Sequence, residues 1–271
     1  MSDSPRGSNA SPPASPGPGG WLTSIATVTG NLYLVIATFI LSLIGIAVSW
    51  IPPRGSWMFA IMRIWSNGLL SASMVRVEAL YDPALEPGRS YIFLSNHQSL
   101  YDIPVLLATC PGQVRMMAKR GLFQIPVFGW GLWAGGFIPV DRADRSTARQ
   151  TFASAAERLR AGTSIAMFPE GTRAPTDALL PFQRGGFLLA LKSGLPIVPV
   201  GLRGTRAVRL RGGLRINPGS VVVSYGAPIQ AADYGLRRKR ELIDEVRRRV
   251  AELAGLEVSA EAAEAAAEGT D

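Results

Sequence analysis

Between Trp21 and Pro53 the chain contains no charged residue. Within this run, the 20-residue segment 32–51, LYLVIATFILSLIGIAVSWI, is long enough to cross about 30 Å of hydrocarbon as a helix. A cleaved signal peptide is the alternative, because AVS before Trp50 loosely resembles a cleavage site. However, the segment begins after residue 30, exceeds the length of a signal-peptide core and follows almost no positive charge. We therefore expect a retained membrane anchor.

The residues on either side of this run indicate its orientation. One arginine precedes the run and three follow closely: Arg6, then Arg54, Arg63 and Arg76. Because positive charge stays on the cytoplasmic side, we expect the C-terminal bulk at the cytoplasmic face of the cytoplasmic membrane. Residues 57–75 carry Trp57 and Trp65 and suit a helix lying in the membrane interface. The sequence leaves open whether 32–51 crosses the bilayer or forms a shallow hairpin with 57–75.

The amino-acid composition limits which partners and sites are expected. Hydrophobic residues make up 47% of the chain, which is high for a soluble enzyme. The formal charge of +8 fits nucleic acid, anionic lipid or phosphorylated substrates. Arginine clusters at 203–215 and 237–249 lack interleaved aromatic residues and accompany an apolar anchor, so an anionic membrane surface is expected and nucleic acid is not. A single Cys cannot form an internal disulfide, and with one His and one Cys we expect no metal site.

Composition also divides the chain into four parts. Residues 1–20 are rich in Pro, Gly and Ser and are expected to be disordered, 21–75 to form membrane-anchoring helices, and 256–271 to be an Ala/Glu-rich tail. In 76–255, short β-rich runs alternate with helical stretches, of which 145–161 and 239–254 show helical spacing. The pattern predicts an α/β fold, a mixed sheet covered by helices, preceded by an N-terminal hydrophobic membrane-anchoring helical segment.

The single histidine lies beside a carboxylate. His97 follows the strand-like run YIFL, and Asp102 comes five residues later, where a helix is expected to begin. Histidine is the usual general base near neutral pH, and a carboxylate can orient it. A lone histidine can equally be a core residue. Asp102 can equally cap the helix, with Pro104 in its first turn. The residues alone leave both interpretations open.

Three cations follow strand-like runs and could form an anion site with His97. Arg173 ends the turn MFPEGTR, Arg142 ends GGFIPVDR, and Lys119 opens AKRGLFQIP. An arginine can hold a phosphate through two parallel hydrogen bonds, although each cation alone is more often a solvated surface charge. The sequence lacks a G-x-S-x-G nucleophile elbow and a Walker phosphate-binding loop. GWGLWAG lacks the spacing and the preceding strand of a dinucleotide site.

Four segments in order resemble one family. NHQSLYD resembles the N-H-x-x-x-x-D motif of the glycerolipid acyltransferases of the 1-acylglycerol-3-phosphate acyltransferase group. GGFIPVDR resembles the second family block, FPEGTR the third and LPIVPVGLRGT the fourth, while PFQRGGF resembles the segment after the third. Order and spacing agree over roughly residues 75–230. The visible departure is Ala174, where family members often have serine.

The resemblance implies that 76–255 is an acyltransferase domain. It would transfer a fatty acyl chain from acyl-CoA or acyl-carrier protein to the free hydroxyl of a lysophospholipid, 1-acyl-glycerol-3-phosphate above all, giving phosphatidic acid. His97 would deprotonate that hydroxyl and Asp102 would orient the imidazole, without a covalent acyl-enzyme, metal or cofactor. The resemblance implies phosphate binding by Lys119, Arg142 and Arg173, and a glycerol pocket shaped by Glu170, Gly171 and Thr172. The alternatives are another lysolipid, such as a lyso-ornithine lipid, or a non-catalytic lipid-binding membrane protein.

Overall fold

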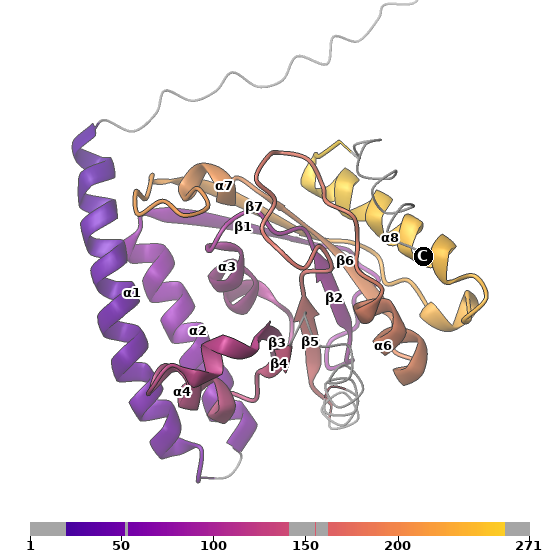
Figure 1. Ribbon diagram of the computed structural model, residues 1–271, viewed down its shortest axis with the longest axis horizontal. Coiled ribbons are helices and arrows are strands. Elements are labelled where there is room, and N and C mark those ends of the chain that lie inside the picture. Colours follow the sequence, from indigo (N-terminus) through magenta and orange to yellow (C-terminus); the bar gives the residue numbers. More distant parts are fainter. Residues whose placement is uncertain (1–19, 52–53, 141–154, 156–161, 258–271) are drawn as a thin grey trace, which may run out of the picture.

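The computed structural model describes residues 20–51, 54–140, 155 and 162–257. Two long helices come first, α1 (Gly20–Val48) and α2 (Arg54–Ala72), and an α/β domain follows (Figure 1). The strands of that domain are β1 (Val75–Tyr81), β2 (Ile92–Ser95), β3 (Val114–Lys119), β4 (Ile138–Val140), β5 (Ser164–Met167), β6 (Ile197–Arg203) and β7 (Gly219–Tyr225). Its described helices are α3 (Asp102–Thr109), η1 (Arg120–Gln124), α4 (Phe128–Ala134), α6 (Gly185–Ser193), α7 (Thr205–Val208), η2 (Ala231–Asp233) and α8 (Lys239–Ala254).

Helices α1 and α2 form a hairpin whose packing depends on glycine. A Cβ atom at Gly68 of α2 would lie 1.9 Å from the hydroxyl oxygen of Tyr33, so α1 approaches α2 closely only because that atom is absent. Trp65 Nε1 also donates to Thr38 Oγ1 across the pair at 2.9 Å. Of the described helices, α1 alone is long and apolar enough to cross a membrane. It begins at Gly20, well before the expected segment 32–51.

The seven strands form the expected mixed sheet, in the order β1-β7-β6-β2-β5-β3-β4. Strands β6, β2, β5, β3 and β4 run parallel to one another. Strand β7 is antiparallel to β6, and β1 is parallel to β7. Each β-rich run of the sequence lies in a strand, whereas β4 is an additional short strand inside GGFIPVDR. Most of the expected helix 145–161 lies outside the described residues.

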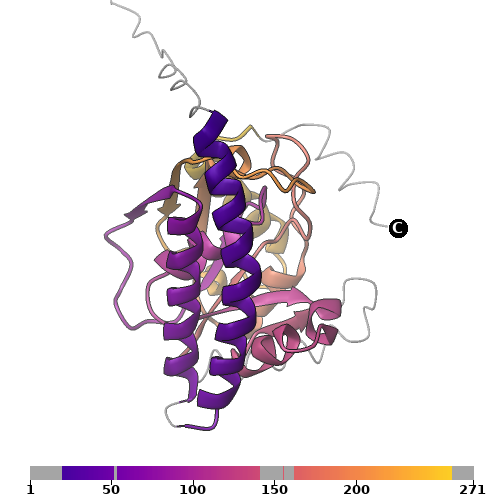
Figure 2. The ribbon, with the colours of Figure 1, turned by 90° about the vertical axis from the view of Figure 1, so that its left-hand side faces the viewer.

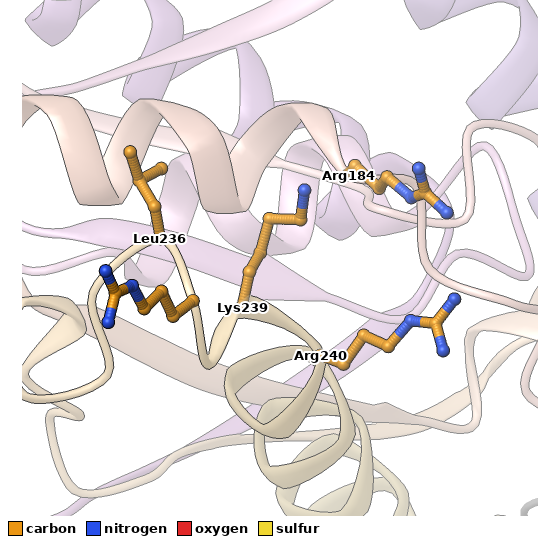
Figure 3. Close-up of a pocket in the computed structure, with 5 residues that line it drawn as sticks. Arg184, Leu236, Lys239 and Arg240 are labelled. Carbon is orange, nitrogen blue, oxygen red and sulfur yellow. The ribbon is translucent and has the colours of Figure 1, made fainter.

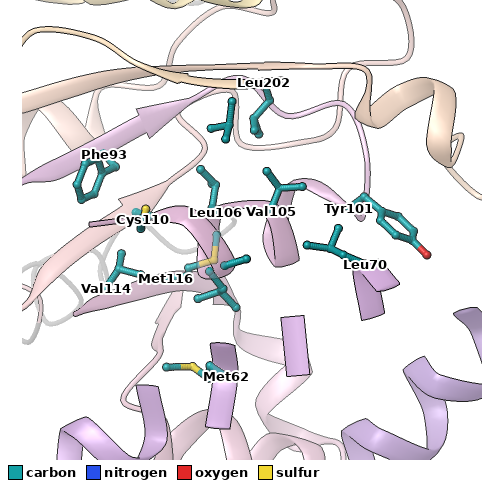
Figure 4. Packing of buried hydrophobic residues seen from close by; sticks show 14 of the residues in the cluster. Met62, Leu70, Phe93, Tyr101, Val105, Leu106, Cys110, Val114, Met116 and Leu202 are labelled. Atoms are coloured by element: carbon teal, nitrogen blue, oxygen red, sulfur yellow. The ribbon is translucent and has the colours of Figure 1, made fainter. Parts of the chain in front are cut away.

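Helices cover both faces of the sheet, which explains the continuous apolar runs of its central strands. On β2, Phe93 points into a core under α2 and α3 (Figure 4), whereas Ile92 and Leu94 point into a second core under α6 and α8. Helix α8 supplies the second core with the apolar positions at helical spacing noted in the sequence. Its last turn approaches β6 so closely that a Cβ atom at Gly201 would lie 2.3 Å from the backbone of Leu253.

Candidate active site

The parallel strands bring the candidate residues to one edge of the sheet. Because β2, β5, β3 and β4 are parallel, their carboxyl ends lie on the same side. His97 follows β2, the segment PEGTR follows β5, and Lys119 ends β3. Arg142 comes two residues after β4 and lies outside the described residues. The tertiary structure thus joins segments that are separated by up to about 70 residues.

The His97 imidazole is oriented by a buried carboxylate. His97 Nδ1 lies 2.7 Å from Asp102 Oδ2, and the Asp102 side chain is fully buried. The same oxygen accepts hydrogen bonds from the backbone N–H groups of Gln98 at 2.7 Å and Ser99 at 2.8 Å. An ionised carboxylate can only accept, so Nδ1 carries the proton and Nε2 presents a lone pair. Within the described residues, Nε2 has no protein hydrogen-bond partner.

The helix-capping alternative for Asp102 is wrong. The N-cap of α3 is Tyr101, which makes no side-chain cap hydrogen bond, and Asp102 is the first helical residue. Its carboxylate turns back to the preceding turn instead of accepting from the next turn of its own helix. A cap would accept from N–H groups two or three residues ahead, whereas Asp102 accepts from residues three and four positions behind.

An aromatic residue from the next strand loop covers one face of the imidazole. The ring of Phe168 stacks on His97 with centroids 3.8 Å apart and planes 9° from parallel. Phe168 comes directly after β5, in the segment MFPEGTR. The stack and the Asp102 hydrogen bond together leave the imidazole little rotational freedom. The sequence pattern does not assign a role to Phe168, although it places this aromatic residue before a Pro-Glu-Gly turn at a strand end.

Glu170 joins the two loops through its carboxylate. Its Oε1 accepts the backbone N–H of His97 at 2.6 Å, and its Oε2 accepts that of Leu180 at 3.1 Å. The side chain is 4% exposed. Burial raises the pKa of Glu170 to about 7, although its hydrogen bonds with His97 and Leu180 act in the opposite direction. Both oxygens are therefore engaged by the backbone of the chain itself, which favours a positioning role for this residue.

Asn96 and Ser99 fix the backbone on either side of His97. The amide of Asn96 makes two hydrogen bonds with Leu202 of β6: Nδ2 donates to its carbonyl at 3.0 Å, and Oδ1 accepts its N–H at 2.8 Å. Ser99 Oγ donates to the carbonyl of Arg209 at 2.7 Å. Both side chains are fully buried. Asn96 therefore replaces a sheet hydrogen-bond pair at the position where β2 ends, a contact that sequence spacing does not indicate.

Of the expected phosphate ligands, the described residues Arg173 and Lys119 follow or end strands at this edge, and arginines from another segment support the loop of Arg173. Arg173 is half-buried and Lys119 is exposed. Arg211 Nη1 donates to the carbonyl of Arg173 at 3.1 Å. Arg206 donates to the carbonyl of Pro175 at 2.6 Å and forms an ion pair with Asp177 nearby. Two arginines of the 203–215 cluster, for which the sequence predicts an anionic membrane surface as partner, thus contact this loop.

Gly171 and Thr172 form the tip of this loop. Gly171 has a φ of +75°, a left-handed conformation that a side chain would strain, and Gln183 packs directly behind it. The side chain of Thr172 is exposed. Among the described residues, no group of three His, Cys, Asp or Glu side chains could hold a metal ion.

Comparisons with known proteins point to one family. The family model described as Acyltransferase matches residues 76–203. The 1-acyl-sn-glycerol-3-phosphate acyltransferase of Haemophilus influenzae is 30% identical over 230 residues, which cover 82% of this chain and 95% of that protein. The Escherichia coli protein of the same name is 34% identical over 170 residues, which cover 62% and 68%. The chain belongs to the 1-acylglycerol-3-phosphate type of the glycerolipid acyltransferase family.

A plant relative matches a shorter portion, and a solved structure matches nearly the whole fold. A chloroplastic 1-acyl-sn-glycerol-3-phosphate acyltransferase of Brassica napus is 37% identical over 163 residues, 59% of this chain and 45% of that protein. This chain therefore spans about half the length of that relative. The crystal structure of the 1-acyl-sn-glycerophosphate acyltransferase of Thermotoga maritima superposes with a TM-score of 0.71 at 23% identity. The superposition covers 88% of this chain and 98% of the Thermotoga maritima chain, so the two proteins share a fold.

Proposed function

We propose that the protein transfers a fatty acyl chain from a thioester to the free hydroxyl of 1-acylglycerol-3-phosphate, giving phosphatidic acid. One observation carries the proposal: a buried carboxylate fixes Nδ1 of His97 and leaves Nε2 without a protein partner among the described residues, at the carboxyl edge of the parallel strands. This is the arrangement that a general base requires. A non-catalytic lipid-binding protein would have no need for it.

In this proposal, His97 moves one proton in each direction. Nε2 removes the proton of the lysophospholipid hydroxyl while its oxygen attacks the thioester carbonyl. The tetrahedral intermediate collapses, the carbon–sulfur bond breaks, and the imidazolium returns the proton to the departing thiolate. Asp102 stabilises the positive imidazole between these steps through the 2.7 Å contact. The acyl group passes directly from sulfur to oxygen, so no acyl-enzyme forms.

The cations at the same edge suit a phosphate-bearing acceptor. Arg173, Lys119 and Arg142 are proposed to hold the phosphate of the lysophospholipid, with Gly171 and Thr172 beside its glycerol. Support comes from the loop that carries Arg173, because the backbone carbonyl of Arg173 accepts a hydrogen bond from Arg211 and the Glu170 carboxylate accepts the N–H of Leu180. A loop backbone held in this way loses less conformational freedom on binding a phosphate than a mobile one.

The α1–α2 hairpin is proposed to lie in the cytoplasmic face of the membrane. Helix α1 exposes large apolar residues along its whole length, and Trp130 and Trp133 of α4 are exposed too. Helix α4 packs beside α1 (Figure 2). An apolar face this large is expected at a membrane interface. The positive-inside bias of the flanking arginines supports the cytoplasmic side.

A shallow hairpin is proposed in preference to a crossing helix, because α1 contacts the α/β domain in both halves. In its first half, Thr27 Oγ1 donates to the carbonyl of Ile216 at 3.2 Å, and Asn31 Nδ2 donates to the carbonyl of Leu214 at 2.8 Å. Further along, Ser42 packs so closely on Gly131 of α4 that a Cβ atom there would lie 2.8 Å from Ser42 Oγ. A helix crossing the bilayer in this arrangement would carry polar parts of the domain into hydrocarbon, which is costly.

One assay tests the catalytic proposal. Purified protein is supplied with palmitoyl-CoA or palmitoyl acyl-carrier protein and with 1-acylglycerol-3-phosphate, other lysophospholipids or lyso-ornithine lipid. We expect phosphatidic acid as the main product, and a loss of about 10²- to 10⁴-fold in turnover for His97→Ala with its melting temperature retained. Preferred turnover of a lysolipid without phosphate would contradict the acceptor assignment. Undiminished turnover of His97→Ala would contradict the mechanism.

A further inference from the structure

A basic pocket lies on the side of the sheet away from the hairpin. It has a volume of about 340 Å³, is open to solvent, and lies between the N-termini of α6 and α8 (Figure 3). One apolar and four cationic residues line it: Leu236, Arg184, Arg237, Lys239 and Arg240. Neither the proposed chemistry nor the proposed phosphate site uses these residues.

The four cations lack acidic partners, and two of them lie where the helix dipole disfavours positive charge. Within the described part of the chain, none of them forms an ion pair; the nearest pair joins Arg238 and Glu241 at 3.7 Å. Lys239 and Arg240 also occupy the first turn of α8, where the helix dipole is positive and acidic residues are favoured. Positive charge gathered at a helix N-terminus costs stability. An anionic ligand there would remove that cost.

The shape of the pocket favours a protein surface as the ligand. Small-molecule sites usually enclose most of their ligand, whereas the cations Arg184, Arg237 and Arg240 of this pocket are exposed. Leu236 is 68% exposed among them. An apolar residue surrounded by charges is typical of protein–protein interfaces with a polar rim. Helices α6 and α8 lie on the opposite side of the sheet from α1 and α2 (Figure 1), so the pocket faces away from the proposed membrane surface.

The pocket is connected to the catalytic edge through adjacent residues. Arg184 directly follows Gln183, whose backbone N–H donates to the carbonyl of Pro169 at 2.7 Å. The side chain of Gln183 packs behind Gly171 of the same loop. A partner bound at the pocket would therefore lie next to the loop that follows β5.

We propose that this pocket docks an acidic, water-soluble protein surface that presents an apolar residue to Leu236. Resting on the proposed function, that protein is the acyl-carrier protein that delivers the acyl thioester. The pocket cations bind carboxylates of the carrier, which places the carrier beside the loop that follows β5 through Gln183. Acyl-CoA, which lacks a protein surface, makes no use of Leu236.

Charge reversal at the pocket tests the proposal. The double variant Arg237→Glu/Arg240→Glu is compared with the wild type and with Lys192→Glu, an exposed cation in the last turn of α6, outside the pocket. For each protein, KM is measured with palmitoyl acyl-carrier protein and with palmitoyl-CoA. Binding of fluorescently labelled acyl-carrier protein is measured separately, without turnover. Glu at position 240 faces the positive end of α8, so the double variant should melt no lower than the wild type.

We expect KM and Kd for the carrier protein to rise at least about fivefold in the double variant, with KM for palmitoyl-CoA and the Lys192→Glu values unchanged. Added salt should weaken carrier binding to the wild type. Unchanged carrier values would overturn the proposal, as would an equal rise for both donors or a rise for palmitoyl-CoA alone. If neither donor is turned over, the proposed function fails, and the binding measurement still decides the docking proposal.

Discussion

His97 is fixed by three contacts from different parts of the chain, two to its imidazole and one to its backbone. Asp102 binds its Nδ1, Phe168 covers one ring face, and Glu170 holds its backbone N–H. Each contact limits one kind of motion: ring rotation, displacement of the ring, and displacement of the backbone. A base held in this way needs little rearrangement before it can accept a proton.

The variant Asp102→Asn tests the role of Asp102 toward the imidazole separately from its role in holding the turn. An amide oxygen at the Oδ2 position can still accept the N–H groups of Gln98 and Ser99, so the turn should persist. A neutral amide cannot stabilise a positive imidazole, and we expect turnover to fall about 10²- to 10⁴-fold. Initial rates and melting temperature measure the two effects. The control is Asp82→Asn, because Asp82 also accepts a turn N–H, from Ala84 at 2.9 Å, away from the site. Near-normal turnover of Asp102→Asn would contradict the mechanism.

The raised pKa of Glu170 makes the free energy of unfolding depend on pH. Burial raises its pKa from 4.5 to about 7 in the folded protein, so the folded state retains a proton that the unfolded chain loses first. The contribution to the free energy of unfolding is complete below pH 4.5 and is lost as the pH rises to about 7. Its full size is about 3 kcal/mol at most. Glu170→Gln carries no titrating group at this position and lacks this loss.

Thermal unfolding from pH 5 to pH 8 measures this effect. The melting temperature of the wild type should fall relative to that of Glu170→Gln as the pH rises. Glu245→Gln is the control, because hydrogen bonds from Arg248 and Arg249 lower the pKa of Glu245 and place its titration below this range. A constant difference between the wild type and Glu170→Gln across the range would contradict the assignment.

At the scale of elements, the hairpin and the sheet have different roles. The sheet brings four strand ends to one edge, where the candidate active site lies. The hairpin supplies an exposed apolar face. Close packing at Gly68 joins α1 to α2, and the Asn31 contact joins α1 to the loop before β7. The proposed membrane face and the candidate active site therefore belong to one packed unit.

Cysteine labelling distinguishes a shallow hairpin from a crossing helix. Ser24 near the start of α1 and Ser56 near the start of α2 are exposed. A crossing helix would place them on opposite sides of the bilayer. In Ser24→Cys and Ser56→Cys we expect a membrane-impermeant maleimide to label both thiols from the cytoplasmic side only. The native Cys110 is silent, because burial raises its pKa to about 12. Labelling of the two positions from opposite sides would contradict the shallow hairpin.

At the scale of the whole molecule, three surfaces are proposed to have different partners. The hairpin and α4 present apolar side chains on one side of the sheet, and the basic pocket between α6 and α8 lies on the other side. The edge with His97 lies between them. On the proposed function, the lipid acceptor arrives from the membrane side and the water-soluble donor from the opposite side. The two substrates then meet at the imidazole without competing for one surface.

The sequence by itself determined the elements whose pattern is local. The buried strand runs and the apolar positions of 239–254 predicted β1 to β7, apart from β4, and α8, because a strand or helix records its buried faces in residue spacing. The motif NHQSLYD indicated the His97–Asp102 pair, because both residues belong to one short turn. The long uncharged run indicated an apolar helix, although not its start at Gly20.

Only the tertiary structure decided which side chains meet. Glu170 reaches the backbone of His97 across 73 positions of sequence, and Arg211 reaches Arg173 across 38. Such contacts depend on strand order, which brings β5 and β6 to either side of β2 and which no single segment encodes. The basic pocket likewise joins Arg184 to residues 236–240. A charged residue in sequence shows only its own charge, whereas its partner is set by packing between distant elements.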